Sequence, residues 1–172
     1  MVTVSIIGIL AAIAVPSYQY SQAKAKVFEA KANLAALFSA EASVSLDQGS
    51  YSACLADIGF TPVVRYYSIG FNASDLATLL VCGPKGDVSC MNTFAGGAAV
   101  ACSAGTLVSA TLSVGGAVPT LDSGDSTSNL LNTITRTTFK AEAVGQISST
   151  GTSSDTWTID HTNTLSNVTQ GY

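Results

Sequence analysis

The sequence predicts an α+β fold, in which a long N-terminal α-helix packs on a small antiparallel β-sheet head. Three observations support this prediction. Residues 2–15 are apolar and uncharged, residues 17–47 have the composition and spacing of an amphipathic helix, and two stretches near the C-terminus alternate apolar and polar residues as strands do. At 172 residues the chain fits one domain, or one domain plus an appendage.

The composition indicates that much of the surface is covered in the native state. Charged residues make up 10% of the chain, the formal net charge is -4, and the mean hydropathy is +0.39. Soluble domains usually contain about 25% charged residues, so we expect membrane or neighbouring subunits to cover part of this one. No basic cluster exists beyond Lys24 and Lys26. This argues against nucleic acid as the main partner, because phosphate groups are bound by basic patches.

The apolar run at residues 2–15 is distinct from a secretory signal peptide. No positive charge precedes it, and a helix-forming segment follows it in place of a cleavage junction. A membrane-spanning helix needs about 20 apolar residues, so this run is too short to span alone. It is therefore either a buried core helix or part of a longer apolar segment that packs against membrane or other copies.

The run Ile6-Ile-Gly-Ile-Leu-Ala-Ala-Ile-Ala-Val-Pro-Ser-Tyr18 resembles the N-terminal segment of type IV pilins. In that family it follows a basic leader ending in Gly and a Phe-Thr-Leu-Ile-Glu-like opening. Neither precedes it here, so the processing site and the N-methylated first residue cannot be placed, and we expect the chain to begin inside a longer apolar segment. The resemblance implies a helix that forms the filament core or membrane anchor through Ile6, Ile7, Gly8, Ile9, Leu10, Ile13, Val15 and Pro16.

The resemblance also implies a division of the chain into two parts. Residues 1–23 would be the projecting apolar half of the helix. Residues 24–172 would be the globular pilin head, with the amphipathic half of the helix at 24–48, a loop at 49–62 and a sheet with a variable region at 63–172. In assembled pilins the stretch that corresponds to residues 8–16 can lose its helical structure.

Helix formation is strongly favoured after Pro16, which should bend the helix. Residues 17–47 lack Gly and Pro, and Asp47 to Gly49 supply a stop signal. An apolar stripe at three- and four-residue spacing should face a sheet, and Glu41 falls inside it. The stripe consists of Val27, Ala30, Leu34, Leu37, Phe38 and Val44.

Four stretches are predicted as strands: residues 63–71, 106–114, 137–147 and 155–160. The last two should form a hairpin, with Lys140, Glu142 and Gln146 on an exposed face. We expect the head core to contain Val27, Leu34, Leu37, Phe38, Phe139, Trp157 and Ile159. Residues 50–51, 57–62 and 155–165 also resemble a deltaproteobacterial-style group of pilins.

The four cysteines are Cys54, Cys82, Cys90 and Cys102. None is spaced as a Cys-x-x-Cys pair, and the single histidine, His161, is far from them in the sequence. This pattern favours disulfides in an oxidising compartment over zinc. Three pairings are possible, and pairing neighbours in the sequence predicts Cys54–Cys82 and Cys90–Cys102.

We find no candidate for catalysis, cofactor binding or metal binding. His161 should be an exposed loop residue, since a general base needs a partnered and partly buried position. Asp122 and Asp125 lack the spacing of a calcium loop and indicate a turn. The sequons at Asn72 and Asn167 are frequent by chance.

These observations predict a structural subunit of a type IV pilus that polymerises through its apolar N-terminal helix. The resemblance implies an inner-membrane location with a periplasmic head before assembly, extraction by the pilus assembly machinery, and a cell-surface filament that serves adhesion, motility or DNA uptake. Two alternatives remain: a pseudopilin of a type II secretion system, and a membrane-anchored secreted binding domain. An enzyme is not expected.

Overall fold

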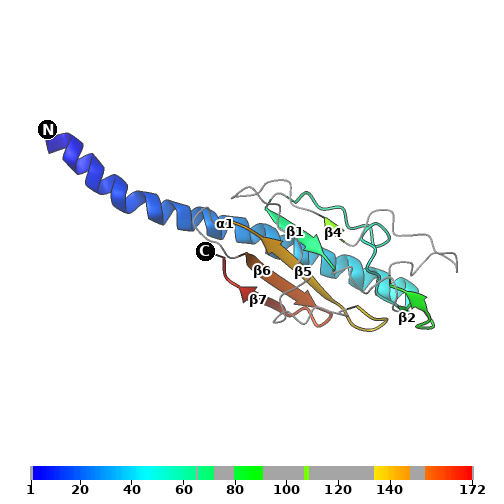
Figure 1. Ribbon diagram of the computed structural model, residues 1–172. Helices are drawn as coiled ribbons and strands as arrows, with labels where there is room; N and C mark the ends of the chain where they lie inside the picture. Colours follow the sequence, from blue (N-terminus) through cyan, green and yellow to red (C-terminus); the bar gives the residue numbers. More distant parts are fainter. Residues whose placement is uncertain are drawn as a thin grey trace.

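The computed structural model describes residues 2–64, 66–71, 80–90, 107–108, 134–147 and 154–171. In these residues one long helix, α1 (Val2–Gln48), precedes all of the strands. The C-terminal half of α1 lies along the sheet, and its N-terminal half projects away from the head (Figure 1). This arrangement confirms the predicted α+β class and is consistent with the type IV pilin fold.

Five strands form the main sheet, in the order β4-β1-β5-β6-β7, and every neighbouring pair is antiparallel. A separate two-stranded sheet pairs β2 with β3. The strands are β1 (Tyr67–Gly70), β2 (Leu80–Cys82), β3 (Val88–Ser89), β4 (Leu107–Val108), β5 (Lys140–Gly145), β6 (Asp155–Asp160) and β7 (Leu165–Thr169).

The helix α1 continues past Pro16 without a break and ends where the sequence predicts. Gly49 follows it with φ +71°, a left-handed conformation that glycine adopts without steric cost. The Gly49 N–H donates to the Ser45 carbonyl at 2.9 Å, which is the hydrogen bond expected at a glycine-terminated helix end. The side chains of α1 that are buried in the head recur every three or four residues: Ala23, Val27, Ala30, Leu34, Leu37 and Glu41.

The hydrophobic core lies between α1 and the sheet. Phe139 is at its centre and is almost fully buried. Its ring packs against those of Tyr51, Phe38 and Phe71, with centroids 4.8, 6.0 and 6.3 Å away. These aromatic contacts join the helix, the loop after it, the residue after β1 and the residue before β5 into one core.

The predicted hairpin of the last two long strands is confirmed. Lys140 pairs with Asp160 at one end of the β5–β6 ladder and Gly145 with Asp155 at the other, while the turn at 148–153 lies outside the described residues. The prediction of a half-exposed strand at 137–147 is wrong. Glu142 is only 2% exposed, because β5 is the central strand and both of its faces are covered.

Other strand boundaries also differ from the prediction. The first strand covers residues 67–70 in place of 63–71. One reason is that the N–H groups of Tyr66 and Tyr67 donate to Glu29 Oε1 on α1, at 2.9 and 3.3 Å. Of the predicted strand at 106–114, residues 107–108 form β4 and the remainder lies outside the described residues. Strands β2, β3 and β7 were not predicted.

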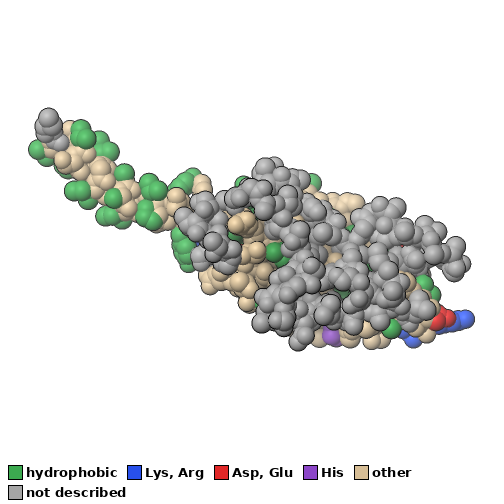
Figure 2. Space-filling model, viewed as in Figure 1, with side chains coloured by type: hydrophobic (Ala, Val, Ile, Leu, Met, Phe, Trp, Pro, Cys, Tyr) green, Lys and Arg blue, Asp and Glu red, His purple; other side chains and the backbone are tan. Residues whose placement is uncertain are grey.

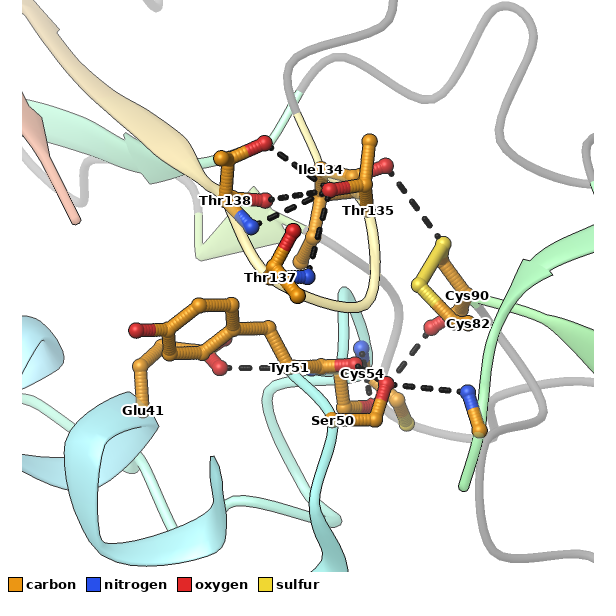
Figure 3. Close-up of a disulfide and its surroundings, with 12 residues drawn as sticks. Glu41, Ser50, Tyr51, Cys54, Cys82, Cys90, Ile134, Thr135, Thr137 and Thr138 are labelled. Carbon is orange, nitrogen blue, oxygen red and sulfur yellow. Dashed lines mark hydrogen bonds between the residues drawn. A yellow bond between two sulfur atoms is a disulfide. The ribbon is translucent and has the colours of Figure 1, made fainter. Parts of the chain in front are cut away.

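The cysteine pairing predicted from the order of the residues is wrong. Cys82 is bonded to Cys90 (Figure 3). The antiparallel β2–β3 hairpin brings these two residues together, and its turn contains Gly83 and Gly86 with φ +79° and +74°. Cys54 is disulfide-bonded as well, and its partner lies outside the described residues. The expectation of disulfides is therefore confirmed, although the pairing is not the predicted one.

Hydrogen bonds fasten this hairpin to the loop that follows α1. The Gly83 N–H donates to Ser50 Oγ at 2.9 Å, and the Ala53 N–H donates to the Cys90 carbonyl at 2.8 Å. The hairpin is also bonded to the segment before β5, where the Arg136 N–H donates to the Val81 carbonyl at 3.0 Å. The disulfide and these bonds hold the end of the head that is opposite the projecting helix (Figures 1 and 3).

Glu41 is fully buried beside this region. Its Oε2 accepts the Ser52 N–H at 3.2 Å, and its Oε1 has no hydrogen-bond partner in the part of the chain that the structure describes. Burial raises the pKa of Glu41 from 4.5 to about 8, and the Ser52 hydrogen bond opposes this rise only in part. The folded head therefore holds a neutral carboxylic acid at neutral pH.

Replacing Glu41 should change how stability depends on pH. The folded state holds a proton that the unfolded state releases, so this stabilisation is complete below about pH 4.5 and is lost as the pH rises towards about 8. The difference is on the order of a few kcal/mol. We expect Glu41→Gln to remove the fall in melting temperature over this range, measured by circular dichroism in detergent. Asp47→Asn, at an exposed position of the same helix, is the control. Equal pH slopes for Glu41→Gln and the parent chain would contradict the prediction.

Candidate assembly surface

Residues 2–22 of α1 make no buried contact with the head, and we call them the projecting segment. Every one of them is exposed, and Ala23 is the first buried residue in the described part of the chain. Figure 2 shows hydrophobic side chains along this segment. Its large apolar side chains are between 52% and 73% exposed: Val2, Val4, Ile6, Ile7, Ile9, Leu10, Ile13 and Val15.

These side chains surround the helix. Successive residues are rotated by about 100°, so Ile6, Ile7 and Ile9 already point in three different directions. The first charged residue of the chain is Lys24, after the projecting segment. A helix that is apolar on all sides is stable only when it is buried, so another molecule or a membrane must cover this one.

The dimensions of the projecting segment suit a bilayer. By length and composition α1 is able to cross a membrane, and it is the one such helix in the described part of the chain. At about 1.5 Å per residue the projecting segment is roughly 30 Å long, close to the hydrocarbon thickness of a membrane. The same apolar surface would also suit a bundle of helices from several copies.

Gly8 and Pro16, which were singled out in the sequence, both lie in the projecting segment. Both are within continuous helix, although each is unfavourable there. A Cβ atom at Gly8 would meet nothing within 4 Å, so packing inside this chain does not require a glycine. Contacts within the subunit therefore do not explain why a glycine is at position 8.

Polar and aromatic residues separate the apolar residues from the head. Tyr18 and Tyr20 are 64% and 49% exposed, and Ser21 Oγ donates to the Ser17 carbonyl at 3.0 Å. The Lys24 ammonium lies over the Tyr20 ring, 4.5 Å from its centroid. The surface of the helix therefore changes from apolar to polar within about two turns.

Charged side chains of α1 attach the helix to the head just beyond this change. Lys26 Nζ donates to the Ile147 carbonyl at 2.9 Å, and burial lowers the pKa of Lys26. Glu29 accepts the two backbone N–H groups that precede and open β1. The Lys31 ammonium lies 4.3 Å from the centroid of the Trp157 ring on β6. These contacts hold the base of the projecting segment in a set orientation.

Asp155 organises the neighbouring end of the sheet. It is fully buried, and its Oδ2 accepts hydrogen bonds from Tyr67 Oη at 2.5 Å and Trp157 Nε1 at 2.7 Å. Its Oδ1 accepts from Asn167 Nδ2 at 3.2 Å and from the Gly171 N–H at 3.3 Å. One carboxylate thus joins β1, β6, β7 and the C-terminal residues.

The structure places the residues proposed from the sequence in two separate groups. The proposed filament-core or membrane residues, Ile6 to Pro16, are all exposed on the projecting segment. Of the proposed core residues, Phe38 and Trp157 are partly buried, and the others are buried: Val27, Leu34, Leu37, Phe139 and Ile159. His161 is exposed, and Cys102, Asp122, Asp125 and Asn72 lie outside the described residues.

Sequence reasoning missed Lys26, Glu29, Lys31 and Asp155. The sequence contained an indication only for Asp155. This residue lies two and four positions before Trp157 and Ile159, so in a strand its side chain points to the same face of the sheet as theirs. For the three helical residues the sequence shows a charged edge to the stripe but not the groups that they contact. In the described residues, no cluster of His, Cys, Asp or Glu side chains is arranged to hold a metal ion.

One half of the apolar helix projects from the α+β head, and the other half packs on its sheet. This arrangement defines a subunit that anchors or assembles through its N-terminal segment.

No protein-family model matches the chain. Its N-terminal region is 48% identical over 62 residues to the type IV major pilin protein PilA of Myxococcus xanthus (strain DK1622). The match covers 36% of this chain and 28% of that protein. The resemblance to type IV pilins is confirmed over this region.

Removing the Asp155 carboxylate should loosen the sheet end and the C-terminal residues. Asp155→Ala leaves Tyr67 Oη and Trp157 Nε1 without the acceptor they share, and each such loss in a buried site costs about 1–3 kcal/mol. We expect a clear fall in the melting temperature and faster amide exchange at Gly171. Asp47→Ala, at an exposed position, should change neither quantity. An unchanged melting temperature for Asp155→Ala would contradict this account.

Proposed function

We propose that this chain is a structural subunit of a type IV pilus and that it polymerises through the projecting segment. One observation carries the proposal: residues 2–22 are apolar on every side, uncharged and exposed, on a chain whose N-terminal region is similar to a major pilin. The proposed role is structural and not enzymatic.

Reburial of the projecting segment would supply the free energy of assembly. Apolar surface removed from water is worth about 25 cal/mol per Å², so several hundred Å² for each subunit is worth on the order of 10 kcal/mol. The same surface would be covered by lipid before assembly. A subunit can therefore move from membrane to filament without exposing the segment to water, and we assign the transfer to pilus assembly machinery.

Before assembly, the projecting segment would lie in the inner membrane with the head in the periplasm. Tyr18 and Tyr20 would then lie at the level of the lipid headgroups, where tyrosines are enriched in membrane proteins. Lys24 follows them and would remain in the aqueous phase. After assembly the heads would form the outer surface of a cell-surface filament, in which they could serve adhesion, motility or DNA uptake.

A charge in the projecting segment should abolish filaments. Ile9 is 64% exposed in the isolated chain, and Ile9→Lys would bury an unpaired ammonium in a helix bundle at a cost of several kcal/mol. The measurement is the yield of filaments sheared from cells that express the full-length chain, together with the amount of chain in the membrane fraction. Val63→Lys, at a head position that is 83% exposed, should leave the yield close to that of the parent chain. Normal filaments from Ile9→Lys would refute the proposal.

Gly8→Ala tests whether the helix must change on assembly. Alanine stabilises a helix interior by about 1 kcal/mol relative to glycine, and the open space around Gly8 admits the methyl group. We expect unchanged head stability and slightly higher helicity in detergent, but fewer filaments, because residues 8–16 would unwind less readily or neighbours would approach less closely. Ala12→Gly, the reverse change in the same segment, should lower the helicity. Filament yields equal to the parent for Gly8→Ala would exclude a role for this glycine.

A further inference from the structure

Three lysines surround α1 at the point where the helix enters the head. They account for three of the seven lysine and arginine residues of the chain: Lys24, Lys26 and Lys31. All three lie within about two turns of helix. At about 100° per residue, Lys24 and Lys31 lie on one side of the buried stripe and Lys26 lies on the other. We call these three residues the lysine collar.

Uncharged groups hold the ammonium groups of the lysine collar. The contacts are Lys24 with the Tyr20 ring, Lys26 with the Tyr66 ring and the Ile147 carbonyl, and Lys31 with the Trp157 ring. A ring or a carbonyl attracts a cation but does not neutralise its charge. Within the described ranges, no carboxylate forms an ion pair with these lysines. The collar therefore keeps its positive charges.

The acidic residues near the collar are occupied by other contacts. Glu29 Oε1 accepts two backbone N–H groups, and Asp155 is fully buried with four hydrogen bonds. Two exposed acidic residues, Asp47 in the last turn of α1 and Asp87 in the β2–β3 hairpin, lie at the opposite end of the head (Figure 1). The chain has a net charge of -4, yet its end next to the projecting segment is predominantly positive.

The depth of the lysine collar matches the headgroup layer of a membrane. If the projecting segment fills the hydrocarbon, Lys24 and Lys26 lie about 3 and 6 Å beyond Gln22 along the helix axis. The headgroup layer on each side of a bilayer is roughly 5–8 Å deep, so both lysines lie at the level of the lipid phosphates. Lys31 is about 13 Å beyond Gln22 and adds to the positive potential, which extends over a Debye length of about 8 Å.

We infer that Lys24 and Lys26 bind the phosphate groups of anionic phospholipids, and that Lys31 strengthens this binding through its charge. The inference rests on the membrane stage of the proposed function, because insertion of the projecting segment brings the collar to the headgroups. Anionic lipids are favoured over zwitterionic ones, since only they carry the net negative charge that the collar lacks. Each lysine close to an anionic membrane surface strengthens binding by about fivefold.

The test measures which lipids surround the full-length chain in vesicles of phosphatidylcholine. A trace of spin-labelled phosphatidylglycerol, which is anionic, or of spin-labelled phosphatidylcholine, which is zwitterionic, is added to the vesicles. Electron paramagnetic resonance then gives the fraction of labelled lipid that is immobilised beside the chain, and the two fractions give the preference for the anionic lipid.

Two matched variants separate the collar from the total charge of the chain. Lys24→Gln removes one charge of the collar, and the head should fold normally because Lys24 is exposed and contacts the Tyr20 ring of the projecting segment. Lys85→Gln removes the same charge from an exposed position of the β2–β3 hairpin, at the opposite end of the head. Lys24→Arg changes the side chain of the collar but keeps its charge.

We expect the parent chain to prefer phosphatidylglycerol by at least about fivefold at about 0.1 M salt. The preference should fall towards one at about 1 M salt, where the Debye length is about 3 Å. Lys24→Gln should lower the preference by at least about twofold, whereas Lys24→Arg and Lys85→Gln should keep it close to that of the parent chain.

Three results would overturn the inference: equal association with both lipids, a preference that persists at high salt, or an equal loss of preference for Lys24→Gln and Lys85→Gln. Each of them leaves the membrane stage of the proposed function intact, because immobilised lipid shows that the projecting segment is inserted. If neither labelled lipid is immobilised, the chain does not enter the bilayer, and the membrane stage of the proposed function is itself refuted.

Discussion

The removal of apolar side chains of α1 from water is the constraint on which the rest of the structure depends. In the C-terminal half of the helix a stripe from Ala23 to Leu37 is buried by the sheet of the same chain. In the N-terminal half the apolar residues surround the helix, and no described part of the chain covers them. The two halves form one continuous helix, so the head and the exposed apolar segment are directly connected.

Contacts at the end of the head next to the projecting segment fix the direction in which that segment leaves the head. Lys26, Glu29 and Lys31 all contact groups of the head. The nearby Asp155 joins β1, β6, β7 and the C-terminal residues through four hydrogen bonds. The opposite end is held by the Cys82–Cys90 disulfide and the hydrogen bonds around Ser50.

The parts of the fold that were predicted correctly are those in which apolar residues recur at a regular short spacing along the sequence. The stripe of α1, its end at Gly49 and the pairing of β5 with β6 follow from spacings of three to four and of two residues. Strand β7 was missed because all five of its residues are exposed and show no apolar alternation. The cysteine pairing was missed because it follows from the short β2–β3 hairpin, whose strands of three and two residues are too brief to show a pattern.

The sequence by itself determined that the chain has an uncharged apolar segment followed by an amphipathic helix and a strand hairpin, because helix formation and side-chain period depend on near neighbours. It also determined the similarity to type IV pilins, through residues 6–18. Only the tertiary structure decided that Glu142 and Glu41 are buried. Only the tertiary structure, too, decided that Lys26, Glu29 and Lys31 of α1 contact groups of the head. The physical reason is that burial and hydrogen-bond partners depend on which distant segments cover each face, and no local pattern in the sequence records that.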